Sequence, residues 1–433
     1  MSSTTIAIII LVGSFFLMLM IGMEIAYALG LSAVFTCMYM KINLLVVFQA
    51  IFMKMANYSL LAVPCFMLMG EFMSIGTMSQ NLVAIANVLV GWMPGGLALV
   101  NVFASMFFGG ISGSSVADVS SLGPIEIKLM TENGYDEDFA AALTCTSSIQ
   151  GIIIPPSHNL VIYAVTAGGV SIAALYMGGI LSGILLGLCL SIYCIIVSKR
   201  RGYGRAEKVT VKSFFTTILK AIPAIIAMVV VVGSVLLGWM TATEAAAAAA
   251  VYTFVYTFLI ERRGSVRSLI GAFRNTIRTI GTVLILTACA TAFSWVITYL
   301  RIPQMVTEGL LSLTTNKYLL LIIINLILLV MGCFMNMLSV VYIMTPIFLP
   351  ICQSFGMHAV QFGIMMIMNL GIGLLTPPVG QVLFVGSSVT GISVEKLTKA
   401  MLPQMIFMVI ALLLVTYVEP LTMWLPRLFG YIV

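Results

Sequence analysis

The chain has 433 residues, of which 61% are hydrophobic and only 8% are charged, and its formal net charge is +6. A soluble domain carries roughly 25% charged residues, so this composition excludes a soluble globular protein. Because a membrane helix needs about 20 mainly apolar residues, the chain has room for on the order of ten spans, and we expect an all-α polytopic membrane protein.

Long apolar stretches follow one another along the chain. The first, Ile6 to Met20, lacks a basic leading segment and a small-residue cleavage site, so we interpret it as a retained helix rather than a signal peptide. Eight cysteines lie in apolar segments without metal-ligand spacing and indicate neither disulfides nor a metal site. The clearest expected spans are 5–22, 24–40, 178–198, 221–240, 244–260, 318–332 and 402–418.

The basic residues gather in two segments, 199–212 and 261–278. The positive-inside rule places both in the cytoplasm, and the even number of expected spans between them agrees with that assignment. We therefore interpret these charges as topology signals rather than as a nucleic-acid or lipid site. Between the two segments, Thr241 and Glu244 precede six alanines and predict a helix-starting capping box.

An internal repeat organises the chain. Gly151-Ile-Ile-Ile-Pro-Pro-Ser157 resembles Gly373-Leu-Leu-Thr-Pro-Pro-Val379, and the shift between them, 373 minus 151, is 222 positions. The same shift relates several other glycine and proline positions, which indicates two homologous halves, commonly of inverted topology in transporters. The expected organisation is scaffold helices at 1–42, a first repeat at 43–198, basic loops and linking helices at 199–266, a second repeat at 267–420 and a tail at 421–433.

Each half contains two segments that break a helix inside the membrane. Glycines, hydroxyls and one carboxylate between apolar flanks predict re-entrant hairpins at about 108–130 and 332–352. Broken helices are expected at about 138–170 and 359–392, because proline lacks an N–H and clashes with the preceding turn. Each break frees backbone carbonyls, which cost several kcal/mol apiece in hydrocarbon unless protein, water or an ion satisfies them.

Unwound carbonyls beside hydroxyls suit a hard monovalent cation, so each hairpin tip and its Pro-Pro break predict one Na⁺ site. Close helix packing through small residues is the structural alternative. The first site would use Ser112, Gly113, Ser115, Gly151, Ile154 and Pro156. The second would use Gly332, Asn336, Gly373, Thr376 and Pro378.

Polar residues beside the breaks are candidates for binding substrate. An intramembrane carboxylate such as Asp118 is a functional candidate, although it is equally suited to capping a hairpin arm. Helices that restart after a break direct their N-terminal dipoles at an anion. The expected substrate-binding residues are Ser157, His158, Asn159, Gln381 and Asp118, with packing as the alternative for His158.

The motifs Phe108-Gly-Gly-Ile-Ser-Gly-Ser-Ser-Val-Ala-Asp118, Gly151 to Ser157, Thr243-Glu-Ala-Ala-Ala247 and Leu375-Thr-Pro-Pro-Val-Gly380 resemble the large membrane subunit of tripartite ATP-independent periplasmic (TRAP) transporters. A proline that often precedes the Thr-Glu pair in that family is replaced here by Thr241-Ala242. The resemblance implies an elevator-type, Na⁺-coupled transporter in the bacterial inner membrane with no other cofactor. It also implies a small four-helix membrane subunit and a periplasmic binding protein as partners. Its substrates would be organic acids, namely C4-dicarboxylates or sugar acids, with Pro155 to Asn159 closer to sialic-acid members.

Two other functions compete with this interpretation. A stand-alone Na⁺-coupled symporter of citrate or dicarboxylate type would also use repeated hairpins, but would need no binding protein. An intramembrane serine protease would use Ser112 as nucleophile and His158 as base. The protease explains neither the second half nor the Pro-Pro pairs. A primary pump is disfavoured more strongly, because the sequence has no phosphate-binding loop and no cytoplasmic stretch large enough for a nucleotide domain.

Overall fold

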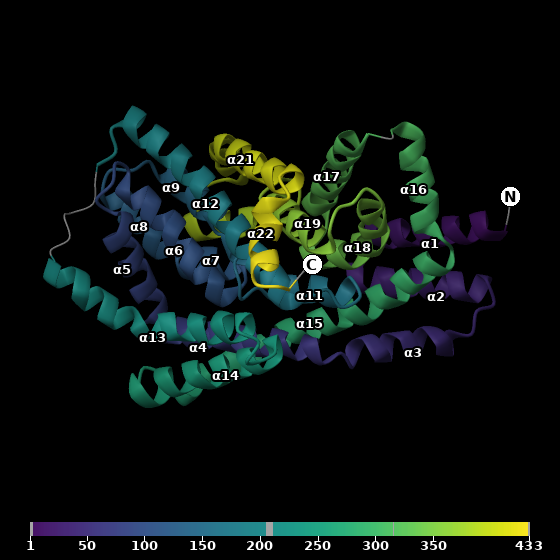
Figure 1. The fold of residues 1–433 in the computed structure, drawn as a ribbon, viewed down its shortest axis with the longest axis horizontal. Coiled ribbons are helices and arrows are strands. Elements are labelled where there is room, and N and C mark those ends of the chain that lie inside the picture. Colours follow the sequence, from purple (N-terminus) through teal and green to yellow (C-terminus); the bar gives the residue numbers. More distant parts are fainter. Residues whose placement is uncertain (1–2, 205–210, 315, 432–433) are drawn as a thin grey trace.

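The computed structural model describes residues 3–204, 211–314 and 316–431, and their regular structure is helical throughout (Figure 1). Nine helices in these ranges are long and apolar enough to cross a membrane, or ten if a pair bent by 48° near Pro155 is one span. The expectation of an all-α polytopic membrane protein is therefore confirmed.

The first half of the chain runs from α1 to α12. Two helices of the N-terminal segment are followed by a broken stretch, a hairpin and a helix interrupted at Pro155-Pro156. The elements are α1 (Ser3–Met20), α2 (Ile25–Tyr39), α3 (Leu44–Met55), a 3₁₀ turn (Tyr58–Leu61), α4 (Ala62–Ile75), α5 (Met78–Val90), α6 (Gly96–Ser112), α7 (Ser115–Ser121), α8 (Gly123–Glu132), α9 (Glu137–Ser147), α10 (Gln150–Ile153), α11 (His158–Thr166) and α12 (Ile172–Arg201).

The second half repeats this order with fewer interruptions. Its elements are α13 (Val211–Leu236), α14 (Ala242–Phe254) continued by a π-helical turn (Val255–Ile260), α15 (Val266–Tyr299), α16 (Ile302–Leu313), α17 (Lys317–Phe334), α18 (Met337–Ser354), α19 (Ala359–Gly373), α20 (Gln381–Thr390), α21 (Val394–Tyr417) and α22 (Pro420–Leu428).

Helix starts keep the 222-residue shift closely. Residue 337 minus 115, 359 minus 137 and 394 minus 172 all give 222, so α18, α19 and α21 begin at positions equivalent to the starts of α7, α9 and α12. The same capping chemistry recurs at the last pair: Ser171 accepts from the backbone N–H of Ala174, and Ser393 from that of Lys396. Short polar side chains at these positions satisfy N–H groups that the helix itself leaves free.

The capping box predicted before α14 is confirmed, since the Thr241 hydroxyl accepts from the Glu244 backbone N–H and the Glu244 carboxylate accepts from the Thr241 backbone N–H. Other boundaries differ from the predicted ones. The first arm of each hairpin begins earlier than predicted, at Gly96 and at Lys317. The prediction relied on the polar residues of the tips, and the first turns of these arms lie outside that polar pattern. The basic segment that begins at Val266 is part of one 34-residue helix rather than a loop.

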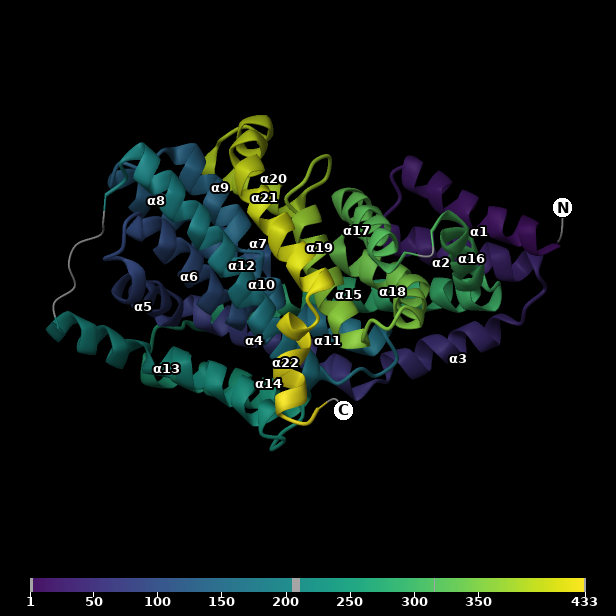
Figure 2. The ribbon, with the colours of Figure 1, turned by 45° about the horizontal axis from the view of Figure 1, so that its top comes forward.

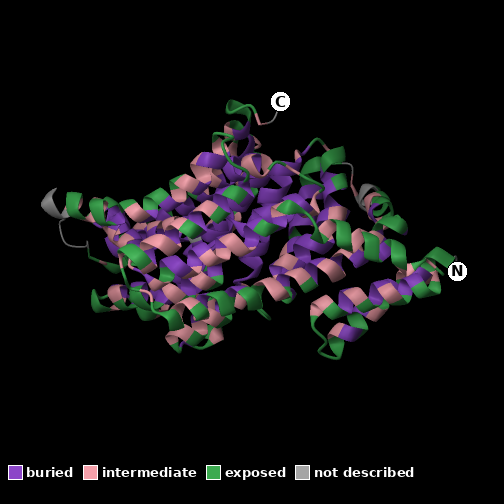
Figure 3. Cartoon of the chain, turned by 90° about the horizontal axis from the view of Figure 1, so that it is seen from below, coloured by how far each residue is buried: buried purple, intermediate pink, exposed green. Residues whose placement is uncertain are grey.

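The helices form two layers. α3, α4, α13, α14 and α15 lie along one edge of the molecule, and the hairpins, broken helices, α12 and α21 lie above them (Figures 1 and 2). In the first layer α14 packs on α4, and α15 packs on α2, α3 and α4. In the second layer α12 contacts α6, α10, α19 and α21, which joins the two halves. Burial is densest in this second layer, whereas the outer faces of the first are exposed (Figure 3).

Candidate functional site

The tip of the first hairpin lies against the first Pro-Pro break. α6 ends at Gly113, whose φ of +61° is a left-handed conformation that favours glycine. A Cβ added to Gly109 would lie 2.1 Å from the Cα of Gly151, and one added to Gly113 would lie 3.2 Å from the carbonyl oxygen of Pro156. The two backbones therefore meet at a distance that side chains would not allow.

Oxygen atoms converge where these backbones meet. Pro155-Pro156 interrupts the helix after Ile154, so the carbonyls at the break have no i+4 donor of the usual kind. The Ser115 hydroxyl, on the first residue of α7, is buried and has no hydrogen-bond partner among the described residues. Ser112 is also buried, and its hydroxyl contacts only the backbone of Ser114, over 3.4 Å. An unpaired buried hydroxyl beside unwound carbonyls is chemically suited to a Na⁺ ion.

The second tip repeats the arrangement with different side chains. A Cβ added to Gly373 would lie 2.8 Å from the carbonyl carbon of Gly332, and the Val379 N–H donates to the Cys333 carbonyl over 3.1 Å. The hydroxyl of Thr376 donates to the Ile372 carbonyl over 2.9 Å and keeps its lone pairs for a cation. The residue equivalent to Ser115 is Met337, so the second tip lacks the free hydroxyl of the first.

Asn159 follows the first break, and Gln381 follows the second break at the equivalent position. Each forms a hydrogen bond with the tip of its hairpin. Asn159 Nδ2 donates to the Gly113 carbonyl oxygen over 3.1 Å, and Gln381 Oε1 accepts from Asn336 Nδ2 over 3.4 Å. The positions differ by 222, so the contact is part of the repeat. Asn336 also caps α18 by accepting from the Leu338 N–H, as Ser114 caps α7 by accepting from the Ala117 N–H.

The five predicted substrate-binding residues are not brought together in this conformation. Ser157 is fully buried and donates to the Ile152 carbonyl over 2.6 Å. Asn159 is committed to the hairpin tip, and His158 is buried beside Gly113 with its Nδ1 atom unpaired. Asp118 is 0% exposed and lies near Ser105 of α6. Only Gln381 lines one of the larger cavities of the described chain.

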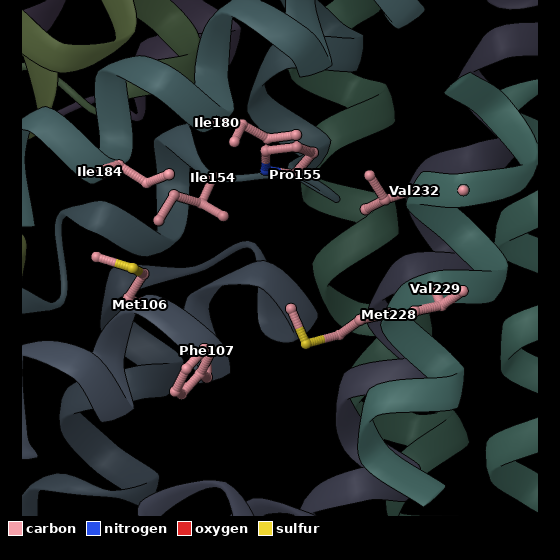
Figure 4. A pocket seen from close by; sticks show the side chains of 10 residues that line it. Met106, Phe107, Ile154, Pro155, Ile180, Ile184, Met228, Val229 and Val232 are labelled. Atoms are coloured by element: carbon pink, nitrogen blue, oxygen red, sulfur yellow. The ribbon is translucent and has the colours of Figure 1, made fainter. Parts of the chain in front are cut away.

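The break at Pro155 also borders an apolar cavity of about 450 Å³ between the second layer and α13. Ile154 and Pro155 project into it from the break, and Met228 and Val232 face them from α13 (Figure 4). The side chains around it are hydrocarbon or thioether, so this cavity offers no group that would recognise an anion. Met228 of α13 also reaches the end of α6, since a Cβ added to Gly110 would lie 3.2 Å from the Met228 terminal methyl group.

The sequence interpretation gave no role to buried Glu126 and placed Arg278, an exposed residue, outside its helix. Glu126 of α8 is 2% exposed, and its Oε2 atom accepts from Asn101 Nδ2 over 3.0 Å. Asn101 also donates to the Thr144 hydroxyl and accepts from the Ser147 hydroxyl, so a polar network lies behind the first hairpin. Arg278 was assigned to a cytoplasmic loop but lies within α15. Both could have been found by asking which charges fall within an apolar helix.

A sequence profile of the tripartite ATP-independent periplasmic transporter DctM component matches residues 12–421, which is most of the chain. The chain belongs to this TRAP family. It is 38% identical to the isethionate TRAP transporter permease protein DctMQ of Oleidesulfovibrio alaskensis over 96% of this chain and 66% of that protein. It is 36% identical to the sialic acid TRAP transporter large permease protein SiaM of Vibrio cholerae over 87% of this chain and 88% of that protein.

The TRAP fold assignment agrees with a solved structure. The YdaH transporter of Alcanivorax borkumensis superposes with a TM-score of 0.65 at 14% identity, over 89% of each chain. As a TRAP permease the chain is a transporter subunit rather than an enzyme. Consistent with this, the hydroxyl of Ser112 contacts Ser114 and forms no hydrogen bond with His158 in the described structure.

Proposed function

We propose that this TRAP permease carries out Na⁺-coupled uptake of an organic acid across the bacterial inner membrane. The acid is delivered by a periplasmic binding protein, and the permease acts together with a small membrane subunit. The observation that carries the proposal is the first tip, where the backbone of Gly113 lies against Pro156 and the hydroxyl of Ser115, two residues after Gly113, is buried without a hydrogen-bond partner among the described residues. A buried hydroxyl without a partner is costly, and a bound cation would satisfy it.

The arrangement of two layers supports an elevator mechanism. The tips and breaks belong to one packed unit with α12 and α21, while α2, α4, α14 and α15 pack on each other in the other layer. The apolar cavity beside α13 lies at that boundary and is lined by hydrocarbon and thioether side chains, so this part of the boundary offers no polar groups that would hold the layers together. In this proposal the second layer moves against the first and carries ions and acid together.

Acids named for relatives define the substrate class. Isethionate is a sulfonate and sialic acid a carboxylate, so the shared feature is one anionic group on a small hydroxylated molecule. C4-dicarboxylates, expected from the family resemblance, share the anionic group with these acids but carry two carboxylates, and succinate has no hydroxyl group. Each net positive charge that enters gains about 2.3 kcal/mol per 100 mV, so ion coupling can concentrate a dilute anion.

The test is uptake of labelled sialic acid, succinate and isethionate into proteoliposomes that contain the permease and its small subunit. Uptake of one acid that requires both an inward Na⁺ gradient and the matching binding protein is the expected result. Gradient-driven uptake without a binding protein would instead identify a stand-alone symporter.

A further inference from the structure

A polar cavity of about 650 Å³ lies between the two layers, beside the tip of the second hairpin. Its first-layer wall comes from the start of α2 and from α15, and its second-layer wall from the tip and from the start of α20. The polar groups that the argument uses are Arg278, Thr279, Thr282, Asn336, Ser339 and Gln381.

Arg278 is the positive charge of this cavity. It lies 12 residues after Val266, the first residue of α15, and therefore about 18 Å along the helix axis. The ion pairs within residues 3–204, 211–314 and 316–431 are Lys128–Glu132, Arg201–Asp136 and Arg427–Glu419, so the Arg278 guanidinium pairs with no acidic group of the described chain. Glu24 lines the same cavity but forms no ion pair with Arg278. The Arg278 side chain is exposed in this conformation, so the cavity wall offers a guanidinium that no carboxylate of the described chain occupies.

We propose that Arg278 binds the anionic group of the transported acid in this cavity, an inference that rests on the proposed function. A planar guanidinium takes a carboxylate in a bidentate manner and offers the same pair of donors to a sulfonate. Thr279 and Thr282 donate to backbone carbonyls of α15 and can still accept from hydroxyl groups of the acid. The Ser339 hydroxyl and the Nε2 atom of Gln381 are further candidates to bind those groups. Glu24 disfavours a second anionic group at that end of the cavity.

A buried hydrogen bond between the two layers lies further along α15 than this cavity. The buried hydroxyls of Thr287 and Tyr342 are 2.6 Å apart and join α15 to α18. Beyond them lies a second cavity, of about 230 Å³, lined by Lys54, Thr291 and Ser294. Lys54 donates to the Val165 carbonyl at the end of α11, which joins α3 to the second layer. The Thr287–Tyr342 contact therefore lies between two cavities, one lined by Arg278 and the other by Lys54.

The charges at the start of α15 indicate which of the two cavities faces the cytoplasm. The positive-inside rule places this end of the helix in the cytoplasm, and Arg278 lies in its first half. Arg278 is thus on the cytoplasmic side of the Thr287–Tyr342 contact and meets the acid before release. Lys54 lies on the periplasmic side.

The test compares Arg278→Gln with Arg274→Gln; both arginines are exposed on α15, but Arg274, one turn earlier, does not line the cavity. Both proteins should keep the melting temperature of the wild type, which shows that they fold. Loss of at least 1.4 kcal/mol of anion binding predicts about a tenfold fall in acid uptake for Arg278→Gln. Uptake by Arg274→Gln should stay within about twofold, and Arg278→Lys should recover part of the loss because it restores the charge.

A second measurement reports on the cavity without transport. With Thr282→Cys in the cavity wall, an anionic thiol reagent should react faster than a cationic one, and Arg278→Gln should remove that preference. The transported acid should slow the reaction only when Arg278 is present. Equal protection with and without Arg278, or equal uptake by the two glutamine variants, would overturn the proposal. Wild-type uptake that ignores Na⁺ or the binding protein would overturn the proposed function, while the protection measurement would still decide the role of Arg278.

Discussion

The contact between Gly151 and the first hairpin sets a strict limit on side-chain size. A Cβ added to Gly151 would lie 2.7 Å from the Cα of Gly109, whereas carbon atoms prefer separations of about 3.5–4.0 Å. Both partners are backbone, so Gly151→Ala must move the hairpin and the break apart by about 1 Å. Overpacking of this kind costs about 1–3 kcal/mol.

That cost should appear in ion binding, because the displaced backbone supplies the proposed Na⁺ ligands. If the overpacking destabilises the ion-bound state by this amount, the half-saturating Na⁺ concentration for acid uptake rises about 5- to 150-fold, at 1.4 kcal/mol for each factor of ten. The assay is initial uptake into proteoliposomes over a series of external Na⁺ concentrations, at a fixed amount of binding protein.

Gly281→Ala is the matched control, because a Cβ there meets nothing within 4 Å and Gly281 lies in the interior of α15. This change should leave the Na⁺ dependence unchanged and stabilise the helix by about 0.5–1 kcal/mol. A Gly151→Ala protein with the Na⁺ dependence of the wild type would refute the assignment of Gly151 to an ion site.

Three further changes test other parts of the account. Ser115→Ala should raise the half-saturating Na⁺ concentration about tenfold, as loss of roughly 1.4 kcal/mol predicts, and unchanged Na⁺ dependence would remove Ser115 from the site. Thr241→Ala should lower the free energy of unfolding by about 0.5–2 kcal/mol through loss of the α14 cap, measured in detergent, and an unchanged value would show that this cap adds nothing. The Tyr203 hydroxyl, and then Arg201, hold the pKa of Asp136 below its ordinary value of 3.8, so this carboxylate stabilises the fold above that pH and loses its effect as the pH falls through its folded pKa. Asp136→Asn should therefore cost less than about 1 kcal/mol at pH 7 and less still in acid, and a cost that grew in acid would contradict this.

The repeated motifs predicted which segments meet, because a hairpin tip and a proline break each carry a local backbone signal. Glycine at positions 109, 113 and 151 permits the close approach, and the prolines fix where the helix opens. The shift of 222 then transferred each prediction to the second half. These are local constraints on the backbone, and a single sequence displays them directly.

Side-chain partners across the fold were not predictable in the same way. Asn159 was expected to face a substrate but donates to the Gly113 carbonyl, since a tip with free carbonyls competes for any nearby amide. Arg278 was assigned to a loop because the first four turns of α15 carry Arg267, Arg274 and Arg278, which lower the apolar signal of a span. The helix is started there by the Ser265–Ser268 capping pair rather than by hydrophobic periodicity.

The central claim is that Na⁺ and the acid cross together. The most direct measurement follows labelled Na⁺ and labelled acid entering the same proteoliposomes, with the binding protein outside and no initial Na⁺ gradient. The account predicts that the acid accelerates Na⁺ entry in a fixed ratio, and that Ser115→Ala reduces both fluxes at low Na⁺ concentration. Acid uptake that brings in no Na⁺ would contradict it.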